Sequence, residues 1–161
     1  MVRVEAPEGF SVLMPKTPDV QRKSVPLMGL GEVHTVTMSA TTNGALYSVT
    51  RAEYPEAAAK QMVPSKLLDD VRAGIVNEIK GTVSKQQDEQ LLGYPGESFA
   101  MTEGNRRIRA RSAVVGNQVF SLIVVYVEGA PQRADEFLDS LALGPVGERP
   151  SWRKWQPRSA A

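Results

Sequence analysis

The sequence has no cysteine and a single histidine, His34, among its 161 residues. Without cysteine, disulfide bonds, thiolate nucleophiles and cysteine metal ligands are all excluded. One histidine cannot form a site with two histidine ligands within one chain. We therefore expect no metal, no cofactor and a protein that is not an enzyme.

Net charge and long apolar segments are also nearly absent. The chain has 19 basic and 18 acidic residues, a formal net charge of +1, which gives no general attraction to nucleic acid or to a membrane. No run approaches the roughly 20 apolar residues of a membrane-spanning helix. No apolar signal segment follows Met1, which indicates a cytoplasmic protein, unless an export signal has been removed and the protein is secreted or belongs to the cell envelope.

The longest apolar run, Val119 to Val127, predicts the central strand of a sheet. Side chains alternate between the two faces of a strand, so a run that is apolar at both parities must be covered on both faces. The length of the chain suits one domain. We place this domain at residues 1–143, followed by a flexible, basic and proline-rich tail at residues 144–161.

Turn sequences predict how the strands pair. Asn43-Gly44 suits a type I′ hairpin, and Gly116-Asn117 suits a type II′ hairpin. A further turn near Gly104-Asn105 extends the second hairpin into a three-stranded meander. Counting outward gives these facing pairs: Ala40 with Tyr47, His34 with Glu53, Phe99 with Ala110, Ala110 with Ile123, and Ile108 with Val125. The counting also places one apolar set on one face of the meander: Phe99, Met101, Ile108, Ala110, Val114, Val119, Ile123 and Val125.

Helical spacing of apolar residues predicts two helices. The main helix spans residues 65–80, with Ser65 as its N-cap and Gly81 just after its end. Gly74 inside this helix is expected to mark close packing on the sheet. A closing helix is predicted at about residues 131–141.

The remaining segments complete the predicted fold. A polar lead-in is predicted at residues 1–8 and a helical turn at residues 55–62, and strands at 10–14, 20–28 and 82–92. The sequence therefore predicts an α+β fold, in which a central antiparallel sheet of about six or seven strands has helices on both faces as an α/β/α sandwich.

Four stretches of the sequence resemble one known family. They are FSVLMPKTP at residues 10–18, GYPGE at 93–97, VGNQVF at 115–120 and FLDSL at 137–141. Together they resemble bacterial domains of the PsbP-like superfamily, whose fold is similar in the PsbP photosystem subunit and in a Ran-binding nuclear-import factor. The resemblance covers about residues 10–143 and implies a central antiparallel sheet sandwiched by helices. Because members are mostly binding, assembly or adaptor proteins, it also implies a binding role, but no functional residue is carried over.

Arg107, Arg109 and Arg111 share one parity of a predicted strand, opposite to the apolar face. Such a row of guanidinium groups can bind a carboxylate-bearing or phosphate-bearing partner. The commoner alternative is that their heads pair with acids of the closing helix, such as Asp135, Glu136 or Asp139. The binding hypothesis expects at least two of the three heads to be reachable by solvent. Saturation of all three by carboxylates of the same chain would argue against it.

Two further features have a functional and a structural interpretation. His34, facing Glu53, has the chemistry of a general base, but a structural cross-strand pair is the favoured interpretation. Trp152 and Trp155 lie among basic residues of the tail, a pattern that can contact nucleic acid or a membrane surface. Docking of the tail on the domain, or disorder, is favoured, and no nucleic-acid partner is expected.

The sequence thus predicts a non-catalytic binding or adaptor module that engages a protein partner through a sheet face or groove. Two alternatives stay open. One is a small-molecule-binding or hydrolytic domain with a site near His34 and Glu53, and the other is a secretion-linked chaperone or adaptor. A deep polar pocket at His34 would favour the hydrolytic domain. A broad, shallow, arginine-lined or apolar surface would favour the binding module.

Overall fold

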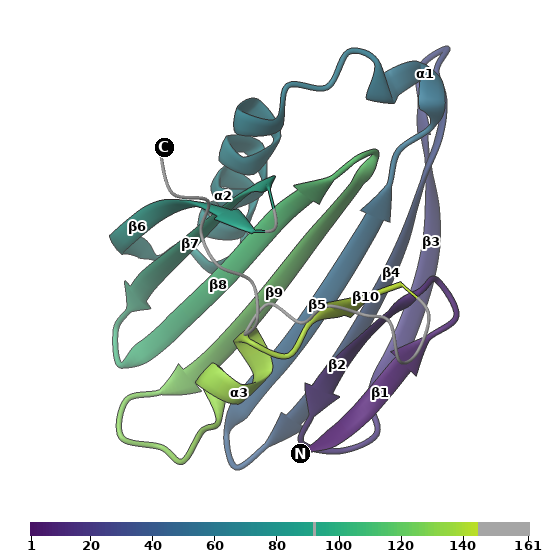
Figure 1. Ribbon diagram of the computed structural model, residues 1–161. Coiled ribbons are helices and arrows are strands. Elements are labelled where there is room, and N and C mark those ends of the chain that lie inside the picture. Colours follow the sequence, from purple (N-terminus) through teal and green to yellow (C-terminus); the bar gives the residue numbers. More distant parts are fainter. Residues whose placement is uncertain (92, 145–161) are drawn as a thin grey trace.

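The computed structural model describes residues 1–91 and 93–144, which form two antiparallel sheets and three helices (Figure 1). The large sheet has the strand order β3-β4-β5-β9-β8-β7-β6, and the small sheet has the order β1-β2-β10. The strands of the large sheet are β3 (Asp19–Leu27), β4 (Gly31–Thr42), β5 (Ala45–Glu53), β6 (Thr82–Leu91), β7 (Tyr94–Glu103), β8 (Arg106–Val115) and β9 (Gln118–Val127). Those of the small sheet are β1 (Val2–Ala6), β2 (Phe10–Met14) and β10 (Ala142–Leu143). The helices are α1 (Glu56–Ala59), α2 (Pro64–Ile79) and α3 (Ala134–Leu138).

The apolar run that predicted a central strand forms β9, the middle strand of the large sheet. Its side chains are buried on both faces, as the alternation requires. Phe120, Leu122 and Val124 belong to the core cluster that the small sheet and α3 cover. Val119 packs with Leu68 of α2 on the opposite face.

The predicted registers of both hairpins are confirmed. Asn43 and Gly44 have φ angles of 51° and 77°, the two positive values that a type I′ turn needs. Ala40 pairs with Tyr47, and Ile108 pairs with Val125. The apolar set predicted on one face of the meander packs beneath α2 in two clusters that include Phe99, Met101, Ile108, Ala110, Val114, Val119, Ile123 and Val125.

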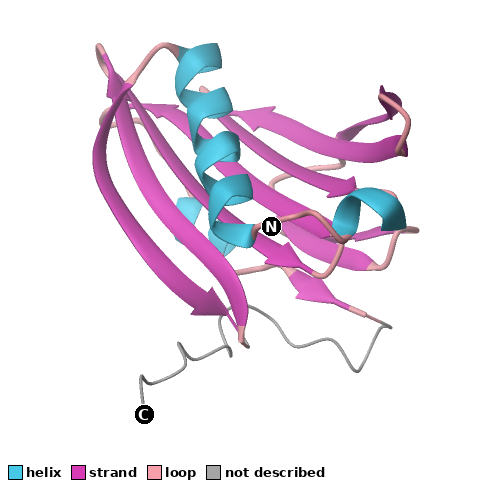
Figure 2. Ribbon diagram, turned by 90° about the horizontal axis from the view of Figure 1, so that it is seen from above, coloured by secondary structure: helices cyan, strands magenta, loops and turns pink. Residues whose placement is uncertain are grey.

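The two faces of the large sheet are covered by different layers. α2 packs on β7 and β8, and Figure 2 shows it as the longest cyan helix, lying against the magenta strands. The other face packs against β2, where Phe10, Val12 and Met14 are fully buried, and against the five-residue α3. The predicted antiparallel sheet of seven strands is therefore present, but a second sheet occupies much of the layer that was expected to be helical.

The segment predicted as a polar lead-in, residues 1–8, contains a strand. β1 pairs along its length with β2, for example Val4 with Val12. Its sequence, VRVEA, alternates apolar and polar residues as a half-buried strand does, so the polar lead-in was a wrong interpretation of a segment that carried a strand signal.

Both predicted helices have different limits in the structure. α2 begins at Pro64, with Val63 rather than Ser65 at the N-cap position, because proline is favourable in the first helical turn. The closing helix is shorter than residues 131–141 and spans only Ala134–Leu138. It ends early because the following residues run into β10, whose Ala142 pairs with Ser11 of β2.

Gly74, expected to mark close packing, is exposed, and a Cβ atom there would have no neighbour within 4 Å. Gly74→Ala should therefore raise the free energy of unfolding by about 0.5–1 kcal/mol, because alanine loses less backbone entropy in a helix. Gly81→Ala is the contrasting variant. Its Cβ would lie 2.8 Å from Met101 Cε and 3.0 Å from the Thr102 carbonyl oxygen, so it should be destabilising. Urea denaturation measures both effects, and a destabilising Gly74→Ala would contradict the exposed position.

The predicted tail lies almost entirely outside the described residues. Gly144 is the last described residue, and its N–H donates to the Gly9 carbonyl at 3.0 Å. Trp152 and Trp155 lie outside the described part, so their predicted contacts stay predictions.

Candidate functional site

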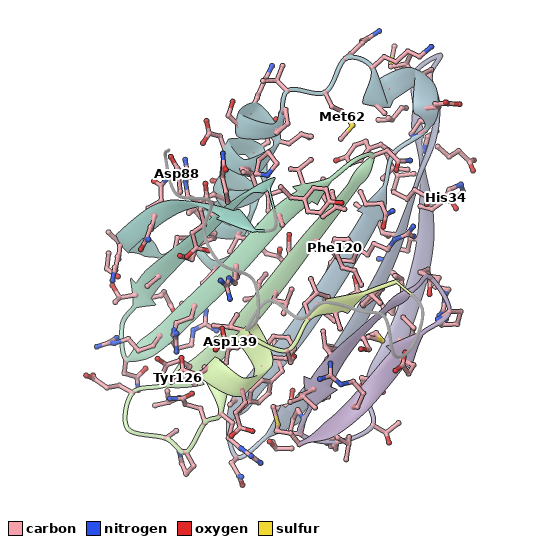
Figure 3. All side chains as sticks on the ribbon, in the orientation of Figure 1. His34, Met62, Asp88, Phe120, Tyr126 and Asp139 are labelled. Carbon is pink, nitrogen blue, oxygen red and sulfur yellow. The ribbon has the colours of Figure 1, made fainter. Side chains whose placement is uncertain are left out.

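A groove lies between α2 and the edge of the large sheet formed by β6 and β7. Its volume is about 610 Å³, and we call it the α2-side groove. Its lining includes Leu68, Asp69, Gln86, Asp88, Gln90 and Glu97. Figure 3 places Asp88 beside α2, at the outer edge of the sheet. Most of its lining residues carry an amide or a carboxylate, but apolar atoms make up more of the lining surface than polar atoms do.

A second groove, of about 290 Å³, lies on the opposite face of the same strands, next to α3. We call it the α3-side groove. Its lining includes Lys85, Ser98, Arg109, Arg111, Leu138 and Asp139. The register of β6 against β7 explains why the two grooves have different linings. On the α2 face, Gln86 pairs with Phe99 and Asp88 pairs with Glu97. On the other face, Lys85 pairs with Ala100 and Gln87 pairs with Ser98.

The Glu97 carboxylate is buried at the base of the α2-side groove, with 2% of the residue exposed. Arg72 of α2 donates to both carboxylate oxygens at 2.6 Å and to Asp69 at 2.9 Å. Burial is the largest influence on the pKa of Glu97 and raises it above its usual value, although the contact with Arg72 acts in the opposite direction. The Arg72–Glu97 pair therefore connects α2 to β7 and fixes one wall of the groove.

The three arginines of the predicted row, Arg107, Arg109 and Arg111, all form ion pairs with carboxylates. Arg107 pairs with Glu128 at 2.8 Å, Arg109 with Asp135 at 2.8 Å, and Arg111 with Asp139 at 3.0 Å and Glu89 at 3.4 Å. Arg107 and Arg109 keep 29% and 38% of their side chains exposed, and Arg111 keeps 16%. The row thus connects β8 to α3 and neighbouring segments, while two of its heads remain reachable by solvent. Arg109 and Arg111, but not Arg107, line the α3-side groove.

His34 and Glu53 face each other across β4 and β5, as predicted, but each side chain bonds elsewhere. His34 is exposed at the outer side of the sheet (Figure 3), and its Nδ1 lies 2.8 Å from Ser24 Oγ. Glu53 accepts from Arg51, whose Nε also donates to Gln118 at 2.9 Å. The carboxylate that would orient a catalytic histidine is therefore engaged by an arginine.

Metal binding and membrane spanning find no support in residues 1–91 and 93–144. Within that part of the chain, no three histidine or acidic side chains gather in a way that could hold a metal ion. No helix in the same part is long and apolar enough to cross a membrane.

The seven-stranded antiparallel sheet, with α2 on one face and the small sheet and α3 on the other, has the PsbP-like fold. The solution structure of cyanobacterial PsbP (CyanoP) from Synechocystis sp. PCC 6803 is similar, with a TM-score of 0.52 over 79% of this chain and 80% of that chain. The two sequences are 11% identical over the match, so the likeness establishes the fold alone. No family model and no curated protein matches the sequence. The resemblance noted in the sequence is thus confirmed at the level of fold.

Proposed function

We propose that this chain is a non-catalytic binding or adaptor module that engages a protein partner through the β6 end of the large sheet. The observation that carries the proposal is the presence of a groove on each face of the same edge strand. Small-molecule sites are mostly apolar, with a few converging polar groups. Apolar atoms also make up the larger part of the α2-side lining, but its amides and carboxylates are distributed along β6, from Gln86 to Gln90, which suits an extended polypeptide better than one small molecule.

Arg109 is the arginine that we assign to the partner contact. Its guanidinium group pairs with Asp135 through one nitrogen and remains partly exposed. A guanidinium group has five N–H donors, so a partner carboxylate can share it without displacing Asp135. Arg111 is less exposed and pairs with Glu89 and Asp139, so we assign it a supporting role in the wall of the groove.

The hydrolytic alternative has weaker support. The contact between Ser24 and His34 is the one observation in its favour. A serine nucleophile also needs a histidine oriented by a third group and donors for the developing oxyanion. Glu53 bonds to Arg51, and the His34 side chain is exposed, so the binding module remains the better supported function.

Site-specific cross-linking tests the binding proposal. A photoreactive residue placed at Gln87 on β6 lies next to both grooves, whereas one at Gln21 lies on β3, at the opposite edge of the sheet. In cells of the native host, we expect a discrete adduct with one protein from position 87 and none from position 21. Absence of an adduct at position 87, or equal adducts at both positions, would overturn the proposal.

The partner identified in this way should then bind the purified chain. Arg109→Glu should weaken that binding by about tenfold, because it reverses the charge at the rim of the α3-side groove. Arg133→Glu is the matched control, since Arg133 is exposed and pairs with one acid of α3, Glu136, outside both grooves. If the two variants lose equal affinity for the partner, Arg109 is not part of the contact.

A further inference from the structure

Among the strands of the described residues, β6 is an edge strand, with β7 as its neighbour in the sheet order. A register shift between Val83 and Lys85 interrupts its first part, and the pairing from Lys85 to Leu91 is regular. In an antiparallel sheet, part of the N–H and C=O groups of an edge strand point away from its neighbour. Within residues 1–91 and 93–144, no strand pairs with these outward main-chain groups in the regular part of β6, so they can pair with a strand that approaches it.

Side chains on the two faces of this edge are sorted by charge. The lining of the α2-side groove includes four carboxylates, Asp69, Asp88, Glu89 and Glu97, and two of them, Asp69 and Glu97, share the single guanidinium group of Arg72. The α3-side groove has the opposite balance. Three cations, Lys85, Arg109 and Arg111, line it together with the carboxylates of Glu89 and Asp139.

A strand added to β6 would direct its successive side chains alternately to the two faces of the sheet. Every second side chain would therefore enter the acidic α2-side groove, and those between would enter the more basic α3-side groove. The edge therefore favours a segment whose side chains alternate in charge, a selectivity that neither groove would have alone.

The other edge strand, β3, lacks this combination. Pro26 removes one main-chain donor near its end, and Arg22 is engaged by Glu8 of the β1–β2 connection at 2.9 Å. Its side chains up to Pro26 are all exposed. Strand addition is therefore better supported at β6 than at β3.

We propose that β6 binds an extended segment of the partner protein by strand addition. The segment would have Lys or Arg at alternate positions facing the α2-side groove, and Asp or Glu at the positions between. This inference rests on the proposed function and specifies the chemistry of the partner. Charge complementarity with the two grooves selects the segment, and main-chain hydrogen bonds to β6 hold it.

The probe is a blocked synthetic heptapeptide in which lysine and glutamate alternate, added to the full chain. We expect hydrogen exchange of the backbone amides of β6 to slow by about tenfold or more at saturation, because strand addition pairs those that were open. Exchange in β3 should not change. A peptide of the same composition with lysines and glutamates in separate blocks, and one in which every amide is N-methylated, should bind much more weakly.

Two matched charge reversals locate the contact. Asp88→Lys should weaken binding of the alternating peptide by about tenfold. Asp19→Lys makes the same change at an exposed position of the other edge strand, β3, and should leave binding unchanged. Exchange measured on both free variants verifies that each is folded before it is titrated.

Three outcomes would overturn strand addition at β6. These are failure of the alternating peptide to bind, equal binding of the block peptide, and binding without slower exchange in β6. Each of them leaves the cross-linking result at position 87 as an independent test of the proposed function. A partner adduct at that position, combined with unchanged exchange in β6, would mean that a partner binds the grooves through side chains alone.

Discussion

Replacing Arg72 by methionine should lower the free energy of unfolding by about 3 kcal/mol at pH 7, because it leaves the buried Glu97 carboxylate without its cation. Arg72 is itself 21% exposed, which places the effect at the lower end of the range for broken buried pairs. Asp69→Asn is the control, since it removes the exposed partner of the same guanidinium group and should cost well under about 1 kcal/mol.

The loss of unfolding free energy in Arg72→Met should also depend on pH. The pKa of Glu97 is raised in the folded protein, so the stability contributed by this carboxyl group is fully present below its unfolded pKa. It is lost as the pH rises through the folded pKa. Without Arg72, which lowers this pKa, the folded value should rise further. The deficit of the variant should therefore shrink between pH 7 and about pH 4.5, as measured by urea denaturation, and a deficit that does not change with pH would contradict this account.

Phe120→Ala should destabilise the protein by about 3–5 kcal/mol, the usual cost of truncating a large core side chain. Phe120 is 2% exposed, on the middle strand of the large sheet. Its ring meets that of Phe10 on β2 edge-to-face, with centroids 5.5 Å apart. The variant therefore loses burial and the contact that connects the two sheets.

Val127→Ala is the control for this variant, because Val127 ends the same strand and is 40% exposed. Its cost should stay within about 0.5 kcal/mol. Thermal or urea denaturation of both variants measures the difference. Similar losses in the two would mean that the face of β9 toward the small sheet is not a packed core.

The strand pairing was predictable because short turns constrain it strongly. Once Asn43-Gly44 and Gly116-Asn117 are placed, each facing pair follows by counting. A shift by one residue would move Ile108 and Ile123 to the opposite face of the sheet. The turn residues and the burial of apolar side chains therefore specify the same register, and the structure has that register.

The small sheet and both grooves could not be predicted in the same way. β10 has only two residues and pairs with a strand far away in the sequence, Ala142 with Ser11, so no local pattern identifies it. The α2-side groove arises because α2 lies beside the edge of the sheet, and the α3-side groove because α3 lies beside the same strands on the other face; both depend on tertiary packing. One signal was available, since Glu97 shares its parity with Phe99 and Met101 in the sequence. An acid on an apolar face indicates a buried partner, which is Arg72.

The position of β2 between β1 and β10 has a consequence for synthesis on the ribosome. Leu13 N–H donates to Ser140 Oγ at 2.9 Å, and Arg3 donates to the Ser140 carbonyl at 2.7 Å. These bonds join residues that lie 137 and 127 positions apart in the sequence. Until residues 140–143 leave the exit tunnel, the apolar side chains of β2 have an incomplete cover, which makes the nascent chain a substrate for chaperones. A stop codon shortly before Ser140 would produce a polypeptide that retains all seven strands of the large sheet and is nevertheless prone to aggregate.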